Sequence, residues 1–295
     1  ASIETNRYST CGLTTAGAAY CWGDGSKNGQ DSDSSVPVAL GGSHTWKAGS
    51  LNGSVNEFCG ITDADAAYCW TSGDPALVPG SRDWKTINPG WQHTCGVTTA
   101  GVGYCWGNNP FGALGNGTDG GGNSAVASVA NAAHGDADIS GGLTWASIDA
   151  GNDRTCGMTT AGVAYCWGRN NDGHLGDGTT DHRNVPTAVS GGHTFASVHG
   201  DDHHCGVTTA GAAYCWGINT LGRLGDGTTD TPTVPVLVSG SHTWDSVIAG
   251  HEFTCGVTTA GVGYCWGGNA NGEIGDSSTT NRSVPTKVSS PLNGG

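Results

Sequence analysis

Short runs of apolar residues alternate with glycine-rich turns, and one such pattern recurs along the whole chain. The sequence T-C-G-V-T-T-A-G-x-x-Y-C-W-G is present in six copies with small changes, and each first cysteine has a partner ten residues later. The copies span 11–21, 59–69, 95–105, 156–166, 205–215 and 255–265. Repeats of roughly 40–50 residues that contain several short strands are typical of β-propeller blades.

One copy shows why the pattern predicts a disulfide-bonded hairpin. A turn centred on Ala161 places Cys156 opposite Cys166 and Gly157 opposite Tyr165. Directly opposed residues of an antiparallel pair lie on one face, close enough for a disulfide. The predicted bridges are Cys11–Cys21, Cys59–Cys69, Cys95–Cys105, Cys156–Cys166, Cys205–Cys215 and Cys255–Cys265.

Two further strands complete each unit. One precedes the hairpin, as in 145–151, and begins with an aromatic residue; its counterparts are Trp46, Trp84, Phe195 and Trp244. The other follows the hairpin and centres on Val-Pro, as at Val185-Pro186, which favours an edge strand. Four strands in each of six units predict an all-β, six-bladed β-propeller, with residues 1–295 as a single domain. Residues 1–3 align with 146–148, so we expect the N- and C-terminal strands to share one blade and close the ring.

Composition places this fold in an oxidising compartment. All 12 cysteines fall in the repeated pairs, which a reducing cytosol would not sustain, so a secreted or cell-surface protein is expected. No CxxC or zinc-finger spacing is present, and neither a metal nor a cofactor is expected. The formal net charge of −14 disfavours nucleic acid as a partner, and no apolar run approaches the roughly 20 residues of a membrane span.

The repeat resembles that of the regulator of chromosome condensation family. The pattern A-G-x-x-x-T-x-x-x-T-x-x-G-x-x-Y-x-W-G-x-N-x-x-G-x-L-G is carried nearly whole by 150–176, and its second half by 109–115, 219–225 and 269–275. The resemblance implies a propeller but no particular activity, because the family includes an exchange factor, a photoreceptor and an enzyme inhibitor. Paired cysteines depart from the family pattern and indicate secretion, and two members of the family have seven blades rather than six.

Residues that break the repeat are the candidates for function, since residues common to every copy serve the scaffold. The most variable segment joins the first strand to the hairpin and is called the connector here. Its aromatic and charged residues, with those beside it, form a candidate ligand-binding face: Arg7, Tyr8, Glu57, Phe58, Trp91, His93, Asp153, Arg154, Asp202, His203, His251 and Phe253. Equivalent connectors of a propeller lie on one face, where such side chains suit recognition. Neutral drift of loop positions explains the same variation.

Other motifs favour structural roles. Asp177-Gly178-Thr179 recurs at 226–228 and fits a capped turn better than a calcium loop. His44, His193 and His242 each precede a Thr-aromatic pair and fit turns. Glycosylation sequons begin at Asn52, Asn116 and Asn281, and their use depends on the secretory route.

The sequence favours an extracellular recognition module that binds a protein or a glycan, with no catalytic residues. A structural subunit of a surface appendage or matrix, capable of self-assembly, is the alternative, because six disulfides suit durability. A hydrolytic enzyme is less favoured, since no nucleophile–base ordering or acid pair is fixed by the repeat. His93, His203, Asp202 and Glu252 are the groups that such an enzyme would use.

Overall fold

Each cysteine hairpin forms as the sequence predicts. In the third copy, Cys95 lies opposite Cys105 and Gly96 opposite Tyr104 in an antiparallel ladder. All six predicted disulfides are confirmed, and each joins cysteines with a sequence separation of 10. Because the two cysteines of a copy face each other across neighbouring strands, the bridge stays within its own sheet.

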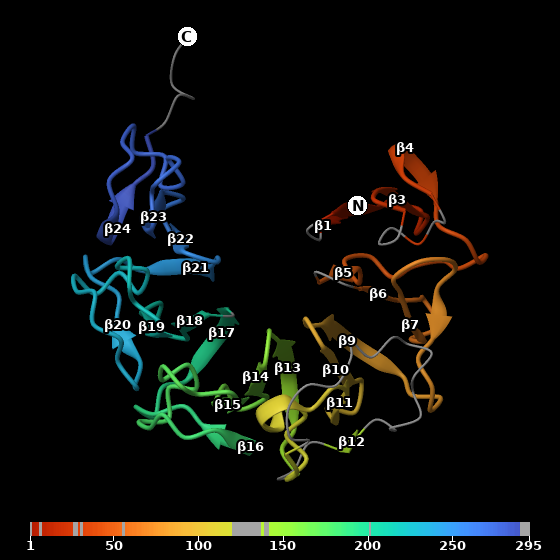
Figure 1. The fold of residues 1–295 in the computed structure, drawn as a ribbon, viewed down its shortest axis with the longest axis horizontal. Coiled ribbons are helices and arrows are strands. Elements are labelled where there is room, and N and C mark those ends of the chain that lie inside the picture. Colours follow the sequence, from red (N-terminus) through yellow and green to blue (C-terminus); the bar gives the residue numbers. More distant parts are fainter. Residues whose placement is uncertain are drawn as a thin grey trace. The chain divides into compact units, whose positions relative to one another are not determined.

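The computed structural model describes residues 2–5, 8–25, 29, 32–54, 57–119, 137–138, 142–200 and 202–289, which form strands and one short 3-10 helix (Figure 1). The first sheet contains β1 (Ser2–Thr5), β2 (Ser9–Leu13), β3 (Ala19–Gly23) and β4 (Ser34–Ala39). The second contains β5 (Asn52–Gly53), β6 (Phe58–Ile61), β7 (Ala67–Trp70) and β8 (Ala76–Leu77). The third contains β9 (Trp84–Pro89), β10 (His93–Thr98), β11 (Gly103–Gly107) and β12 (Ala137–Asp138), with the 3-10 helix Pro110–Gly112 after β11.

The remaining strands repeat the same order. The fourth sheet contains β13 (Trp145–Ala150), β14 (Arg154–Thr159), β15 (Ala164–Gly168) and β16 (Arg183–Ala188). The fifth contains β17 (Phe195–Gly200), β18 (His203–Thr208), β19 (Ala213–Gly217) and β20 (Val236–Leu237). The sixth contains β21 (Trp244–Ala249), β22 (Phe253–Thr258), β23 (Gly263–Gly267) and β24 (Arg282–Lys287). Six four-stranded sheets are therefore confirmed.

The chain divides into two compact units, Ala1–Thr155 and Cys156–Gly295. That residues 1–295 form a single domain stays a prediction. The expectation that the two terminal strands share a sheet is wrong: β1 pairs with β2 in the first sheet, and β24 pairs with β23 in the sixth. Each run of four consecutive strands completes its own sheet, so no strand is left over for sharing.

One local expectation also needs correction. Trp46 makes only an isolated bridge with Thr62, and the paired first strand of the second sheet is β5 instead. The intervening residues bring Leu51 into the core, where it is 1% exposed. Within the Gly-rich stretch 120–142, β12 pairs with β11; most of the rest lies outside the described residues.

The core lies between successive sheets and has the same composition each time. Trp84 and Ile87 of the third sheet pack against Cys59, Ile61 and Cys69 of the second. The same arrangement places the second sheet on the first, the fifth on the fourth and the sixth on the fifth. We call the side with the first-strand aromatic residue the front face, and the side with the disulfide the back face. Each of these interfaces joins a front face to the back face of the preceding sheet.

A glycine in each hairpin makes room for the first-strand aromatic ring. A Cβ added at Gly206 would lie 2.6 Å from the ring of Phe195, and one at Gly96 would lie 2.6 Å from Trp84. Real Cβ atoms do not approach other atoms so closely, so any larger residue must displace the ring. The glycine is therefore required by packing on the front face.

Candidate functional site

The candidate residues divide into surface and interior groups. Tyr8 and Trp91 are 48% and 41% exposed, and His251 is exposed as well. Glu57, Asp153, Asp202 and Phe253 are partly buried. Four candidates are buried within the protein: Phe58, His93, Arg154 and His203. Arg7 lies outside the described residues.

The two buried histidines link neighbouring sheets through a threonine. His93 Nε2 lies 2.7 Å from Thr155 Oγ1, and the same hydroxyl donates to the carbonyl of Ala113 at 2.9 Å. His203 Nε2 lies 2.6 Å from Thr254 Oγ1, which donates to the carbonyl of Arg223 at 2.8 Å. A hydroxyl has one proton to give, so each threonine accepts from Nε2–H of a neutral imidazole.

Burial favours that neutral form. It lowers the pKa of His93 to about 4. It lowers the pKa of His203 to about 3, and Coulombic interactions with Arg223, His251 and His174 act in the same direction. Neither imidazole therefore carries a charge near neutral pH, and each joins two neighbouring sheets through a hydrogen bond.

Glu57 takes the same place between the second and third sheets. The Thr94 hydroxyl donates to its carboxyl at 2.8 Å, and burial raises the pKa of Glu57 to about 7. Oxygen and sulfur atoms of Glu57, Cys59 and Cys69 lie within 4.8 Å of one another. Both sulfurs belong to a disulfide and cannot act as thiolate ligands, so the geometry does not make a metal centre.

Adjacent connectors contact each other within each unit. The N–H of Trp91 donates to the carbonyl of Gly151 at 3.2 Å, joining the third connector to the fourth. In the other unit, Arg223, in the loop after β19, donates from Nη1 to the carbonyl of His251 in the sixth connector at 2.8 Å. These bonds hold exposed connector residues in fixed positions, which suits recognition more than a mobile loop would.

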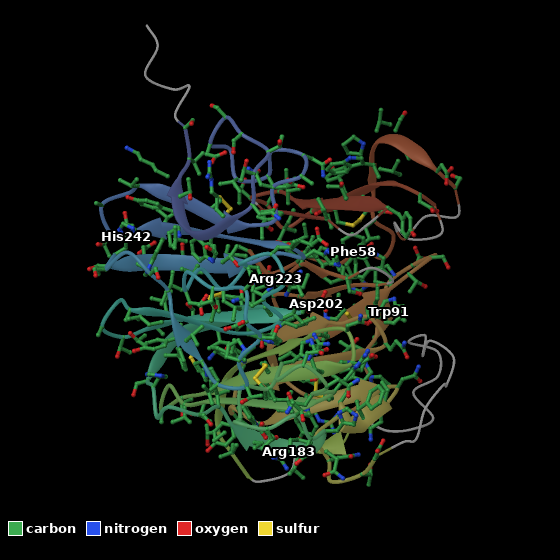
Figure 2. The ribbon with its side chains drawn as sticks, turned by 60° about the vertical axis from the view of Figure 1, so that its left-hand side comes forward. Phe58, Trp91, Arg183, Asp202, Arg223 and His242 are labelled. Atoms are coloured by element: carbon green, nitrogen blue, oxygen red, sulfur yellow. A yellow bond between two sulfur atoms is a disulfide. The ribbon has the colours of Figure 1, made fainter. Side chains whose placement is uncertain are left out.

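A mixed-charge cluster lies on the fifth and sixth connectors. His251 Nε2 is 3.7 Å from Asp202 Oδ2, within ion-pair distance when the imidazole is protonated. Arg223, which contacts the sixth connector from the loop after β19, is 5% exposed; Arg223 and Asp202 are labelled in Figure 2. Burial lowers the pKa of Arg223, while the carboxylates of Asp202 and Glu252 act in the opposite direction. The cluster combines hydrogen-bond donors and acceptors of both charges, as polar contact surfaces of protein partners do.

Sequence reasoning missed Arg223 and misread three histidines. Arg223 stands in the G-x-L-G motif, where the other copies have Ala113, His174 and Glu273, so its variability was a readable signal. His44, His193 and His242 do more than shape turns: each ring packs on the hairpin tyrosine of its sheet, with centroids 4.2, 3.8 and 4.4 Å apart. The capped-turn interpretation of Asp177 is confirmed, since its carboxylate accepts from the N–H and hydroxyl of Thr179.

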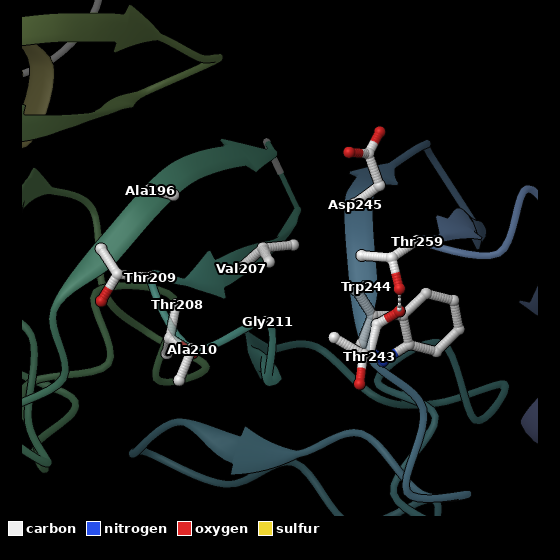
Figure 3. A pocket seen from close by; sticks show the side chains of 10 residues that line it. All are labelled: Ala196, Val207, Thr208, Thr209, Ala210, Gly211, Thr243, Trp244, Asp245 and Thr259. Carbon is white, nitrogen blue, oxygen red and sulfur yellow. Dashed lines mark hydrogen bonds between the residues drawn. The ribbon is translucent and has the colours of Figure 1, made fainter.

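An open hollow of about 310 Å³ lies at the opposite end of β18 from the connector (Figure 3). The hairpin turn at Thr208 and Gly211 forms one side, and Trp244, Asp245 and Thr259 of the sixth sheet form the other. Threonine hydroxyls and one carboxylate line it, with no nucleophile–base pair among the lining residues.

Comparison with known proteins gives a repeat family and a fold. Residues 161–207 and 210–257 match a regulator of chromosome condensation (RCC1) repeat, and residues 145–173 match a second description of that repeat. No curated protein matches the sequence.

Several solved structures resemble the chain at low identity. Prp20p from Saccharomyces cerevisiae, reported with its binding to Gsp1p and histones, has a TM-score of 0.78 at 17% identity, over 99% of this chain and 77% of that chain. Human WBSCR16 has a TM-score of 0.74 at 17% identity, over 85% and 68%. The ectodomain of the Physcomitrella patens receptor kinase CR4 has a TM-score of 0.57 at 22% identity, over 88% and 59%. At these identities the likeness shows the fold alone.

Proposed function

The chain is an RCC1-like β-propeller, and from this premise we propose that it is an extracellular module that binds a protein partner through its connectors. The six disulfides indicate an oxidising environment. None of the described residues forms a helix able to cross a membrane. A solved receptor-kinase ectodomain of similar fold supports an extracellular setting, and the yeast structures, reported with Gsp1p, histones and Kap60, support a protein partner.

Trp91 carries the proposal. It belongs to neither repeated tryptophan series, and among the described residues it is the one tryptophan with an exposed side chain. Its backbone is fixed by the hydrogen bond to Gly151. An exposed tryptophan with a fixed backbone is typical of the few side chains that dominate a protein interface.

Binding by a Trp91→Ala variant tests this face. We expect an at least tenfold loss of affinity for a partner captured from secreted extract and then purified, with an unchanged melting temperature. Leu237→Ala is the matched control, since Leu237 is 56% exposed on the outer strand β20. Retained affinity in Trp91→Ala would count against the third connector. Binding to a glycan array that depends on Trp91 would assign the same face to a sugar.

Binding is favoured over catalysis because the hydroxyl groups that contact a base at the described connectors lie between sheets: Thr94 bonds to Glu57, and the two buried histidines are occupied by threonine hydrogen bonds. Hydrolysis of a polysaccharide panel by the purified protein would overturn that part of the proposal. A structural subunit remains the second candidate function, favoured by the six disulfides, which suit durability.

A further inference from the structure

The residue that follows the first-strand aromatic residue is a β-bulge whose chemistry differs between sheets. In the third, fifth and sixth sheets the ladder between the first two strands skips this residue, which is Lys85, Ala196 or Asp245. A bulged residue takes no part in the pairing, which re-aims its side chain, and bulges are common beside functional sites. The same position holds Lys47 in the second sheet and Ala146 in the fourth. Among these five residues, Asp245 is the one with a carboxylate.

The hollow between the fifth and sixth sheets contains two of these positions (Figure 3). Ala196 lies on its fifth-sheet side, beside Val207 and Ala210, and Asp245 lies on its sixth-sheet side. A hollow of roughly 300–1,000 Å³ with apolar walls and few polar groups is typical of a ligand site, and this one measures about 310 Å³. No residue in the described part of the chain bonds to the carboxylate of Asp245, which is exposed. The carboxylate is therefore available to a ligand.

The boundary between the third and fourth sheets shows which group such a hollow accepts. There Lys85 takes the place of Ala196, and Ala146 takes the place of Asp245. The ammonium group of Lys85 donates a hydrogen bond to the carbonyl of Ala146 at 3.3 Å, from one sheet to the next. At this boundary the chain thus supplies its own alkylammonium group between the two positions.

The two boundaries are packed alike around these positions. A Cβ added at Gly101, in the third hairpin turn, would lie 2.7 Å from Thr144. A Cβ added at Gly211, in the fifth hairpin turn, would lie 2.6 Å from Thr243. The boundaries therefore differ in the residues that line them rather than in how the sheets meet. Between the fifth and sixth sheets the lysine is absent and a negative charge has been added opposite its place.

We propose that the hollow between the fifth and sixth sheets binds the side chain of a lysine from another polypeptide. The aliphatic part of that lysine packs against Val207 and Ala210, and its ammonium group bonds to the carboxylate of Asp245. An ammonium group has three donors, and the threonine hydroxyls that line the hollow accept the others. The formal net charge of −14 attracts a cationic partner. The hollow lies at the opposite end of β18 from its connector, so this site is separate from the one proposed at Trp91.

Titration with Nα-acetyl-lysine methylamide, followed by NMR at the backbone amides of Thr209 and Thr243, tests the site. We expect saturable shifts with a Kd of about 1–10 mM, since one charged side chain in an open hollow binds weakly. Nα-acetyl-norleucine methylamide has a similar aliphatic chain without the ammonium group, and it should leave these amides unchanged. Glucosamine carries an ammonium group on a sugar. Tighter binding of glucosamine than of the lysine probe would assign the hollow to an amino sugar and overturn the proposal.

Two single substitutions remove the site in different ways. Asp245→Asn keeps the shape of the side chain and removes its charge, and we expect about a tenfold loss of affinity for the lysine probe. Ala196→Lys supplies within the chain the lysine that Lys85 supplies at the other boundary, and it should abolish binding. Asp230→Asn, which removes another exposed carboxylate of the same unit, is the control and should bind like the native protein. Melting temperatures check the folding of all three variants.

The reverse exchange should create a second site. Replacing Lys85 by Ala and Ala146 by Asp in one protein gives the boundary between the third and fourth sheets the residues of the hollow. We expect the lysine probe to shift the amides of Thr99 and Thr144 in this double variant and to leave them unchanged in the native protein. Unchanged amides in the double variant would refute the equivalence of the two boundaries, from which the ligand is inferred.

Three further results would overturn the proposal: a native protein without saturable shifts, an Asp245→Asn variant that binds as tightly as the native protein, or equal shifts with the norleucine probe. Binding that persists in a folded Ala196→Lys variant would place the ligand outside the hollow. None of these results bears on Trp91, which lies on a connector in the other unit, so failure here is distinguishable from failure of the proposed binding function.

Discussion

Burial of Glu57 should make the stability of the protein depend on pH. The carboxyl lies between the second and third sheets, accepts a hydrogen bond from Thr94, and has its pKa raised from 4.5 to about 7. Glu57→Gln is the perturbation that isolates this effect. Glutamine keeps the shape and can still accept the hydrogen bond through its amide oxygen, but it cannot ionise.

The sign and size follow from linkage. Because the folded protein holds the proton more tightly than the unfolded chain, this contribution to stability is fully present below pH 4.5 and is lost as the pH rises through 7. A shift of this size corresponds to about 3.5 kcal/mol, at about 1.4 kcal/mol for each pKa unit. Partial exposure of Glu57 reduces the effect, so we expect about 1–2 kcal/mol.

Urea unfolding with the disulfides intact, at pH 4.5, 6 and 8, measures the effect. Native protein and Glu57→Gln should be similar at pH 4.5, and the variant should be the more stable by about 1–2 kcal/mol at pH 8. Glu252→Gln, which removes an exposed carboxylate from the sixth connector, is the control. Parallel pH profiles of native protein and Glu57→Gln would refute the reasoning, as would a Glu57 pKa near 4.5 by NMR.

Three further predictions concern the scaffold. His203, whose pKa burial lowers to about 3, contributes stability that is present above pH 6.5 and lost as the pH falls through 3; His203→Asn should flatten the acid limb of the urea-unfolding profile, and an unchanged limb would contradict the buried neutral imidazole. Gly206→Ala should lower the free energy of unfolding by about 1–3 kcal/mol, measured by calorimetry, because the added Cβ meets the ring of Phe195. Gly263→Ala should be nearly neutral, because the nearest atom to a Cβ there, on Val288, lies 3.9 Å away. Equal costs for the two variants would exclude the ring contact. Replacing both Cys156 and Cys166 by Ala should lower the free energy of unfolding by about 2–3 kcal/mol, as measured in urea. An unchanged free energy of unfolding would contradict a stabilising role for this bridge.

The repeated units could be predicted from the sequence because their contacts are local. Cys156 and Cys166 are ten residues apart, and a tight turn leaves one pairing register for them. The order of strands within each sheet follows the order in the sequence for the same reason. The second sheet was harder, because the residues between Trp46 and β5 separate the aromatic residue from its strand, and nothing in the pattern shows where pairing resumes.

The candidate site was only partly predictable, because strand boundaries decide which side chains face solvent. His93, Arg154 and His203 were assigned to connectors, yet each is the first residue of a strand and is buried. Trp91, two residues before β10, stays outside. A shift of one or two residues in the start of a strand separates surface from interior, and variability alone does not reveal that difference.

The last connector position of the repeat therefore joins neighbouring sheets in three copies, through a carboxyl group in one and an imidazole in two. Glu57, His93 and His203 each bond to a threonine of the next sheet, and burial disfavours a charge on each of them. The acid loses stabilisation as the pH rises and the two histidines lose it as the pH falls, so all three side chains are uncharged in the folded protein between about pH 4 and 7. Each of these three residues also ends a connector, and its hydrogen bond holds that connector against the next sheet. Because a binding residue is only as precise as the groups that hold it, the buried end of each connector gives its exposed end, Trp91 included, a fixed place from which to bind.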